Sequence, residues 1–255
     1  MGGPGELLVV GPGLAAAIAV ALLAAAGICL AARLGHAAGV LRAGVRAVVQ
    51  LGAVSLIIAS VVSSGPLTLC FVAVMLAVAS VTAGRRITAS RTGAWAAVSI
   101  AVPVLPVLAV LVAVGLVPRT GLALIPLAGI LIGGALTATV LAGRRVTEEL
   151  RSRRGEVEAA LSLGLLPRDA AIEIARPAAA AALLPALDQT RTVGLVTLPG
   201  AFVGMLLGGA TPFEAGAVQV FVLVALLLVE SAAIVITLEL IARAVLTPDE
   251  PAIPR

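Results

Sequence analysis

The sequence predicts an all-α membrane protein, a polytopic bundle of about seven transmembrane helices. Two observations support this class. Of the 255 residues, 61% are hydrophobic, and the mean hydropathy is +1.19, a composition that calls for bilayer spans because helices of about 20 apolar residues cross the hydrocarbon core. At roughly 20 to 25 residues per span, the chain has room for about seven helices and one substantial loop. We therefore expect one membrane domain over residues 1–255.

Four spans are expected in the first half of the chain, at about 7–32, 45–62, 67–83 and 94–117. No basic residue precedes the first apolar run, which favours a retained span over a cleaved signal peptide. A basic segment at 33–46 separates the first two spans, and the uncharged turn Ser63-Ser64-Gly65-Pro66 separates the next two. Arginines close the third span. Pro103 and Pro106 lie inside the fourth span and are expected to kink it.

Three further spans are expected at about 122–142, 192–207 and 215–242. Arg144 and Arg145 end the fifth span, and a polar island from 143 to about 190 follows it. A turn at 208–212 without a basic residue joins the last two spans. The island is too charged to enter the bilayer, so we expect a helical loop outside it.

Arginine orients the predicted bundle. The chain has 17 basic residues, all of them arginine, and all but Arg119 fall in 33–46, 84–93, 143–191 or the C-terminal tail. Because positive charge accumulates on the cytoplasmic side, we expect the N-terminus outside, the C-terminus in the cytoplasm and a cytoplasmic island.

The absence of lysine excludes two kinds of chemistry. A Walker phosphate-binding loop and a Schiff-base mechanism both need a lysine, so neither can exist in this chain. The sequence pI of about 10.8 reflects arginines beside apolar segments, which indicates membrane orientation and lipid contact in place of nucleic-acid binding. Cys29 and Cys70 are expected to pack, and with His36 as the single histidine no metal-ligand spacing exists, so the metal site is unknown.

The pattern of residues in the island predicts two helices joined by a turn. Glu149 and Arg153 form a favourable i, i+4 pair, which by itself fits an ordinary solvated helix. The apolar stretch 159–166 follows, with Gly164 breaking the helix and Pro167 suited to starting the next one. An apolar stretch outside the bilayer needs cover, and this one suits insertion into a groove of another protein.

The island also resembles the coupling loop of ABC-transporter permeases, which carries Glu-Ala-Ala, a Gly at fixed distance and then Ile-x-Leu-Pro. The matching residues, which the resemblance makes the ATPase-coupling element, are Glu158, Ala159, Ala160, Gly164, Ile174 and Pro177. Arg176 stands where that pattern has Leu.

Longer segments are similar to the Fet-type (YbbM-like) ABC permeases, a family that includes bacterial iron-export permeases and plant permeases linked to aluminium tolerance. The similar segments are 184–200, 46–51 and 125–133. The resemblance implies one permease domain of the cell (plasma or inner) membrane, paired with a separate ATP-binding subunit that uses the ATP. It therefore implies no catalytic residue and no cofactor bound by this chain. It also implies two copies of each chain and export of a metal ion such as iron.

This chain departs from the family at three positions where cargo contacts are conceivable. Phe202 and Val203 stand where relatives often carry Met and then Ser or Thr, and Gly134 stands where they often carry Asn. Two other functions remain open: an ion-coupled secondary transporter that uses the intramembrane Glu230, and a membrane scaffold that transports nothing.

Polar residues that are costly in lipid are the first candidates for a transport pathway. Gln50 is either a helix–helix hydrogen-bonding residue or a ligand, and Glu230 is either a cation- or proton-interacting carboxylate or a packing residue. Gly200, Gly204 and Gly208 share one helical face, suited to a packing seam, a subunit interface or a gate. The complete set of pathway candidates is Gln50, Asp188, Arg191, Pro199, Gly200, Gly204 and Glu230.

Overall fold

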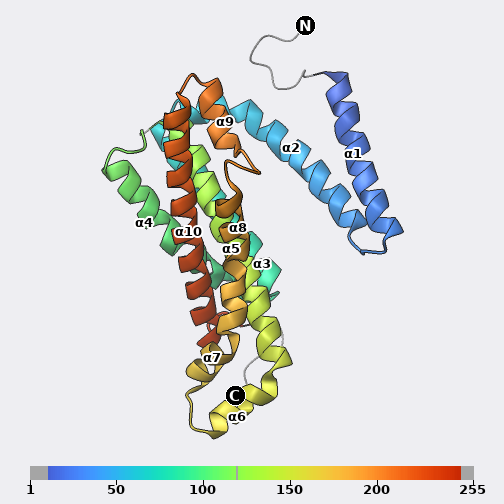
Figure 1. Cartoon of the computed structure of the whole chain (residues 1–255), viewed down its shortest axis with the longest axis vertical. Helices are drawn as coiled ribbons and strands as arrows, with labels where there is room; N and C mark the ends of the chain where they lie inside the picture. Colours follow the sequence, from blue (N-terminus) through green and yellow to red (C-terminus); the bar gives the residue numbers. More distant parts are fainter. Residues whose placement is uncertain (1–10, 119, 248–255) are drawn as a thin grey trace. The chain divides into compact units, whose positions relative to one another are not determined.

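The computed structural model describes residues 11–118 and 120–247, and among these all regular structure is helical apart from one isolated β-bridge between Val193 and Thr197 (Figure 1). Seven helical stretches are long and apolar enough to cross a membrane. They lie at Pro12–Ala31, Ala37–Val62, Gly65–Ile87, Arg91–Ala113, Gly121–Ser152, Pro167–Thr192 and Pro212–Ala242. The all-α class and the number of spans are confirmed.

The chain divides into two compact units, with the boundary between Val61 and Val62. The first contains α1 (Pro12–Ala31) and α2 (Ala37–Val62), which form a helical hairpin (Figure 1). Gly44 permits a close approach, because a Cβ there would lie 2.5 Å from Leu22 Cδ1. The expectation of a single permease domain stays a prediction.

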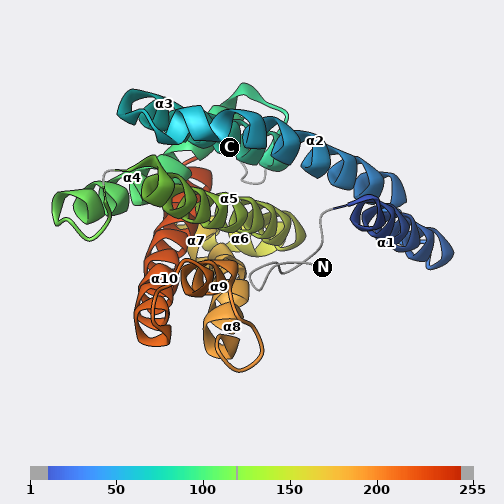
Figure 2. The same ribbon diagram turned by 90° about the horizontal axis from the view of Figure 1, so that it is seen from above.

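The second unit is built on α3 (Gly65–Ile87), α4 (Ala96–Ala113), α5 (Gly121–Ser152) and α10 (Pro212–Ala242). These four helices pack on one another, with α5 beside α10 and α3 in both views (Figure 2). A short 3₁₀ turn, η1 (Arg91–Trp95), leads into α4. Pro103 and Pro106 lie inside α4, as the sequence predicted.

Glycine contacts bring the helices of the second unit close together. Gly84 of α3 faces Gly93 of η1 so closely that a Cβ at Gly84 would lie 2.3 Å from the Gly93 carbonyl oxygen. Gly143 of α5 similarly faces Ile87, with the nearest side-chain atom 2.7 Å from an ideal Cβ. In a bilayer the lipid tails are as apolar as the helix side chains, so helices associate largely through van der Waals packing. Small residues such as these glycines allow the close approach that this packing requires.

The polar island contains more helix than the sequence indicated. α5 continues to Ser152, and α6 (Arg154–Ser162), α7 (Pro167–Ala180), η2 (Ala181–Leu183) and α8 (Leu184–Thr192) follow it. The stretch Pro167–Thr192 is itself one of the candidate spans. The second half of the predicted loop 143–190 is therefore long and apolar enough to cross the membrane.

The predicted sixth span at 192–207 is wrong. Val193 is extended (ψ 137°), Gly194 has a left-handed φ of +83°, and only the eight residues of α9 (Gly200–Leu207) are helical there. The amides of Leu195, Val196 and Thr197 donate to the Thr192 carbonyl, and Pro199 is the N-cap of α9. Sequence hydropathy missed this break because the broken segment is as apolar as a helix.

Candidate functional site

The α6–α7 turn is fixed by a glycine C-cap. Gly164 has φ +92°, its amide donates to the Leu161 carbonyl at 2.9 Å, and the Leu165 amide donates to the Ala160 carbonyl at 3.1 Å. This pair of bonds is the Schellman motif, in which glycine takes the left-handed position without steric cost. The helix break predicted at Gly164 is therefore present, and Pro167 is the first residue of α7.

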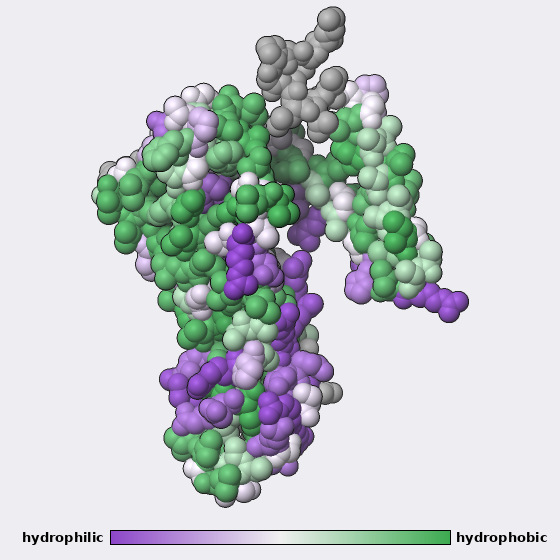
Figure 3. Space-filling model, viewed as in Figure 1, coloured by the Kyte–Doolittle hydropathy of each residue, from purple (hydrophilic) through white to green (hydrophobic). Residues whose placement is uncertain are grey.

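Three leucines of this turn form an exposed apolar knob, which comprises Leu163, Leu165 and Leu166. Leu163 is 83% exposed and Leu166 is 68% exposed. Figure 3 shows apolar residues at the α6–α7 end of the second unit, below a band of hydrophilic residues. The knob is thus an exposed apolar surface that lies between the charged start of α6 and the first turn of α7.

Charged residues at the start of α6 pair with one another. Arg153 contacts Glu149 at 3.2 Å, and its guanidinium also donates two hydrogen bonds to the Glu156 carboxylate. These bonds lower the pKa of Glu156 and, with Glu149, raise the pKa of Arg153. The Glu149–Arg153 pair is confirmed. Glu158, a predicted coupling residue, bonds Arg154 at 3.0 Å with its side chain still exposed.

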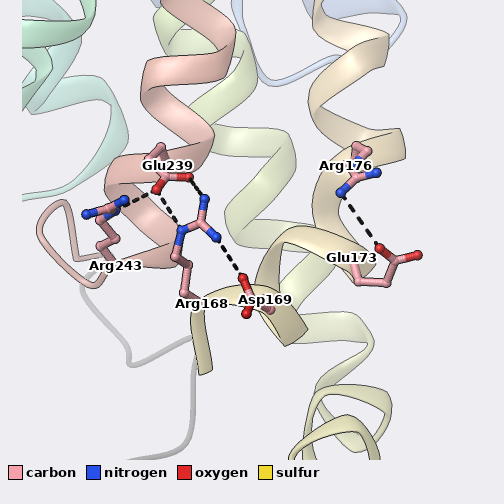
Figure 4. Close-up of polar contacts among 6 residues, drawn as sticks. All are labelled: Arg168, Asp169, Glu173, Arg176, Glu239 and Arg243. Atoms are coloured by element: carbon pink, nitrogen blue, oxygen red, sulfur yellow. Dashed lines mark hydrogen bonds and ion pairs between the residues drawn. The ribbon is translucent and has the colours of Figure 1, made fainter. Parts of the chain in front are cut away.

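An ion-pair cluster joins the first turn of α7 to the end of α10 (Figure 4). Arg168 donates from Nε to Glu239 Oε1 at 2.7 Å and from Nη2 to Oε2 at 2.9 Å. Arg243 also bonds Glu239, at 2.5 Å, and Asp169 accepts from Arg168 at 2.7 Å. Sequence reasoning missed this contact, because its partners are 71 residues apart and no short-range pattern connects them.

The predicted pathway residue Glu230 lines a cavity of about 240 Å³ between α5, the η2–α8 segment and α10. Gly133, Gly134 and Thr137 of α5 and Gln189 of α8 line the same cavity. Within the described residues, neither the Glu230 carboxylate nor the Gln189 amide has a hydrogen-bond or ion-pair partner. Thr137 and Gln189 were not among the predicted site residues, although Thr137 is a polar side chain in a mostly apolar segment and Gln189 lies within the segment 184–200 that resembles the family.

The other predicted pathway residues are not among those that line this cavity. Gln50 is exposed on α2 of the first unit. Asp188 and Arg191 pair at 3.7 Å on α8, both with exposed side chains. Pro199 precedes α9, and its carbonyl accepts from the Val203 amide at 3.2 Å, so this carbonyl is already engaged. Pro199 thus interrupts the helix as expected.

The glycine face of α9 is open within the described part of the chain. An added Cβ would meet no atom within 4 Å at Gly200 or Gly204. The loop before it also exposes large apolar side chains, with Leu195 92% and Val196 77% exposed. This face is therefore free to contact lipid or another chain.

The remaining predicted coupling residues differ in their accessibility. Ala159 is exposed on α6, while Ala160 is half-buried. Ile174 is buried in the second unit, and Pro177 lies exposed inside α7. Ile174 consequently contributes packing in place of a contact surface. Among the described residues, no three His, Cys, Asp or Glu side chains gather as a metal-binding group.

The fold and these surfaces define a multi-pass helical membrane protein in which the short helix α6 and the α6–α7 turn lie between two candidate spans. Residues 13–246 match the family described as Uncharacterised protein family (UPF0014). The chain belongs to that family.

Three relatives illustrate the match. The chain is 37% identical over 194 residues to "UPF0014 membrane protein STAR2" of Oryza sativa subsp. japonica, covering 75% of this chain and 68% of that protein. It is 37% identical over 150 residues to "Protein ALUMINUM SENSITIVE 3" of Arabidopsis thaliana, covering 58% of this chain and 55% of that one. It is 35% identical over 115 residues to "Probable iron export permease protein FetB" of Escherichia coli K12, covering 45% and 44%.

The aligned region thus spans about half the length of the second and third of these relatives. No solved structure matches the chain. The resemblance predicted from 184–200 and the other segments is confirmed at the level of the family.

Proposed function

We propose that this chain is the transmembrane permease subunit of an ABC transporter and that a separate ATP-binding subunit drives it. One observation carries the proposal: the α6–α7 hairpin presents an exposed leucine knob and is tied to a span by Arg168 and Glu239. The relative named a probable iron export permease supports transport, and iron export is the cargo and direction we propose. ATP is bound by the partner chain.

The hairpin offers a route for coupling. Leu163 and its neighbours dock the partner, and α7 packs on both α5 and α10. Arg168 holds the first turn of α7 to Glu239, and α10 also carries Glu230 nine residues earlier. A push on the turn therefore moves helices that line the Glu230 cavity, as expected when nucleotide closure of a partner switches two arrangements of a packed bundle.

A second copy of the chain completes the assembly. Residues 193–199 are irregular, and their Leu195 and Val196 side chains are exposed. α9 spans only eight residues, roughly 12 Å of helix, between this loop and the turn before α10. Irregular backbone at membrane depth is tolerated only where protein or a water-filled cavity surrounds it. We place the second copy against this loop and the glycine face of α9.

We further propose that α6 and the α6–α7 turn are cytoplasmic, with the N-terminus outside and the protein in the cell membrane. Single cysteines at Leu163 and Leu116, in a chain lacking Cys29 and Cys70, test the orientation. An impermeant thiol reagent added to intact cells should label the cysteine at 116 and spare the one at 163. The reverse pattern refutes the orientation.

Co-purification with the candidate ATP-binding subunit tests the function. Glu158→Arg and Gly164→Asp change the predicted coupling residues, but Gly164→Asp also strains the turn because φ is +92°. Leu163→Asp is cleaner, since the side chain is 83% exposed and supports no described contact. The matched control is Leu116→Asp. Leu116 is also an exposed leucine, but it lies in the loop before the N-terminus of α5, whereas α6 follows the C-terminus of α5.

We expect the complex to survive Leu116→Asp and to be lost with Leu163→Asp. Binding of the ATPase by neither wild type nor variants, or equal binding by both variants, contradicts the proposal. The half-buried Glu230 in its cavity then favours the second candidate, an ion-coupled secondary transporter. That function predicts transport without any ATPase and its loss in Glu230→Gln.

A further inference from the structure

The Glu230 cavity contains an unusual set of side chains for a membrane-spanning helix bundle. Glu230 sits twelve residues before the end of α10 at Ala242, roughly 18 Å along the helix. Carboxylates within spans are costly in lipid and mark pathways when they face a cavity. The unpartnered Gln189 amide joins it from α8.

Thr137 supplies an acceptor to the same cavity. Its hydroxyl donates to the Gly133 carbonyl at 3.0 Å. A hydroxyl has one hydrogen and two lone pairs, so the Thr137 oxygen is left to accept or to coordinate. The polar lining thus consists of carboxylate, hydroxyl and amide groups, all of which provide oxygen.

Gly134 makes the space that the Glu230 carboxylate occupies. A Cβ at residue 134 would lie 2.6 Å from Glu230 Oε1 and 2.5 Å from Leu226 Cδ2. The neighbouring Gly133 also lines the cavity, yet a Cβ there would meet no atom within 4 Å. Any side chain at 134 must displace the carboxylate, and the same change at 133 need not.

The chemistry of the lining selects the ligand. No thiol, thioether or imidazole lines the cavity, and oxygen donors without sulfur or nitrogen suit hard cations such as Mg²⁺ and Mn²⁺. About 240 Å³ holds roughly eight water molecules at about 30 Å³ each. A single carboxylate cannot replace the hydration shell of such an ion, and small hard cations keep several waters when few carboxylates bind them.

We propose that the Glu230 cavity binds a partly hydrated hard divalent cation, with Glu230 as its charged anchor and Thr137 and Gln189 as oxygen ligands. Gly134 is the residue that keeps the anchor in place. This inference rests on the proposed function, since it assigns the cargo site of the permease to these residues. It widens the proposed cargo from iron to divalent cations that bind through oxygen.

Manganese alone is the probe, because its electron paramagnetic resonance spectrum reports both binding and bound water. The purified full-length chain in nanodiscs is titrated with Mn²⁺ as wild type, Glu230→Gln, Gly134→Ala and Gly133→Ala. We expect one ion per wild-type chain and affinity at least about tenfold weaker in Glu230→Gln, the size seen when groups supporting a metal are removed. Gly134→Ala should also weaken binding several-fold, and Gly133→Ala should stay within about twofold of wild type.

Wild-type affinity in Glu230→Gln overturns the proposal, as does an equal effect of alanine at 133 and at 134. A spectrum that shows no water bound to the Mn²⁺ would reject the claim that the cation is partly hydrated. If Gly134→Ala does not fold by size-exclusion chromatography, Thr137→Val replaces it, and unchanged binding there removes Thr137 from the site.

The outcome is separable from that of the proposed function. Mn²⁺ binding without any ATPase complex rejects the ABC permease and retains the ion site, whereas an ATPase complex without Mn²⁺ binding rejects the ion site alone.

Discussion

Replacing Gly84 by alanine tests whether backbone contact between α3 and η1 sets the packing of the second unit. The added Cβ would lie 2.3 Å from the Gly93 carbonyl oxygen and 2.8 Å from its carbonyl carbon. An ordinary contact begins at 3.4 Å, so the two backbones must separate by about 1 Å. The obstacle is backbone and not the end of a flexible side chain, so it cannot simply rotate away.

The expected cost follows from two opposing effects. Overpacking costs about 1–3 kcal/mol, and alanine recovers about 1 kcal/mol of helix propensity relative to glycine. We therefore expect a net loss of up to about 2 kcal/mol. At about 2–4 °C per kcal/mol for a protein of this size, the midpoint of thermal unfolding should fall by up to about 8 °C.

Thermal unfolding of the purified chain in one detergent is the assay, with Gly133→Ala as the control because its Cβ meets nothing within 4 Å. The control should unfold at or slightly above the wild-type temperature. A midpoint for Gly84→Ala that equals or exceeds that of Gly133→Ala refutes the reasoning, since it means that the α3–η1 contact is not as close as described.

Arg168→Ala should speed hydrogen exchange of the first turns of α7, because it removes both hydrogen bonds to Glu239 at the end of α10. The control Arg176→Ala should leave exchange unchanged, since its 3.8 Å partner lies on the same helix. Equal exchange in the two variants would mean that the ion-pair cluster does not hold α7 to α10. Glu156 has its pKa lowered by Arg153, so its contribution to α6 is complete above the ordinary carboxyl pKa and is lost as pH falls through the lowered one. Hydrogen exchange of the α6 amides at a series of acidic pH values, corrected for the intrinsic exchange rate, measures this, and protection that does not fall with pH contradicts it. Gly204→Leu should abolish crosslinking between two copies of the chain without lowering the unfolding temperature, because no described atom faces that Cβ position. Crosslinks that persist in this variant would show that the interface lies elsewhere.

Several features of the candidate site followed from short-range pattern. Gly164 had to end α6 because it precedes a proline that starts α7, and the structure places a Schellman turn there. Glu149 and Arg153 pair as their spacing predicted. Glu230 was identifiable as a carboxylate within an apolar run, and it does line a cavity.

Long-range contacts decided the rest. Arg168 and Glu239 are unremarkable charged residues in the sequence, and only the packing of α7 on α10 brings them together. The sequence marks Gly134 as a departure from the family, but only the structure shows why a glycine stands there. The Glu230 carboxylate occupies the space that a side chain at residue 134 would need.

The sequence by itself determined that this is an all-α membrane protein of seven candidate spans, because apolar composition and span length are local properties that the bilayer selects. It also determined the family, the turn at Gly164 and the identity of the costly carboxylate. Only the tertiary structure decided where the sixth span lies. Hydropathy measures the transfer of side chains into lipid and carries no information on backbone dihedral angles. The apolar residues 193–199 therefore resemble part of a span, although Gly194 and Pro199 interrupt the helix there. Which polar groups meet in one cavity was likewise set by helix packing, since Thr137, Gln189 and Glu230 come from three separate helices.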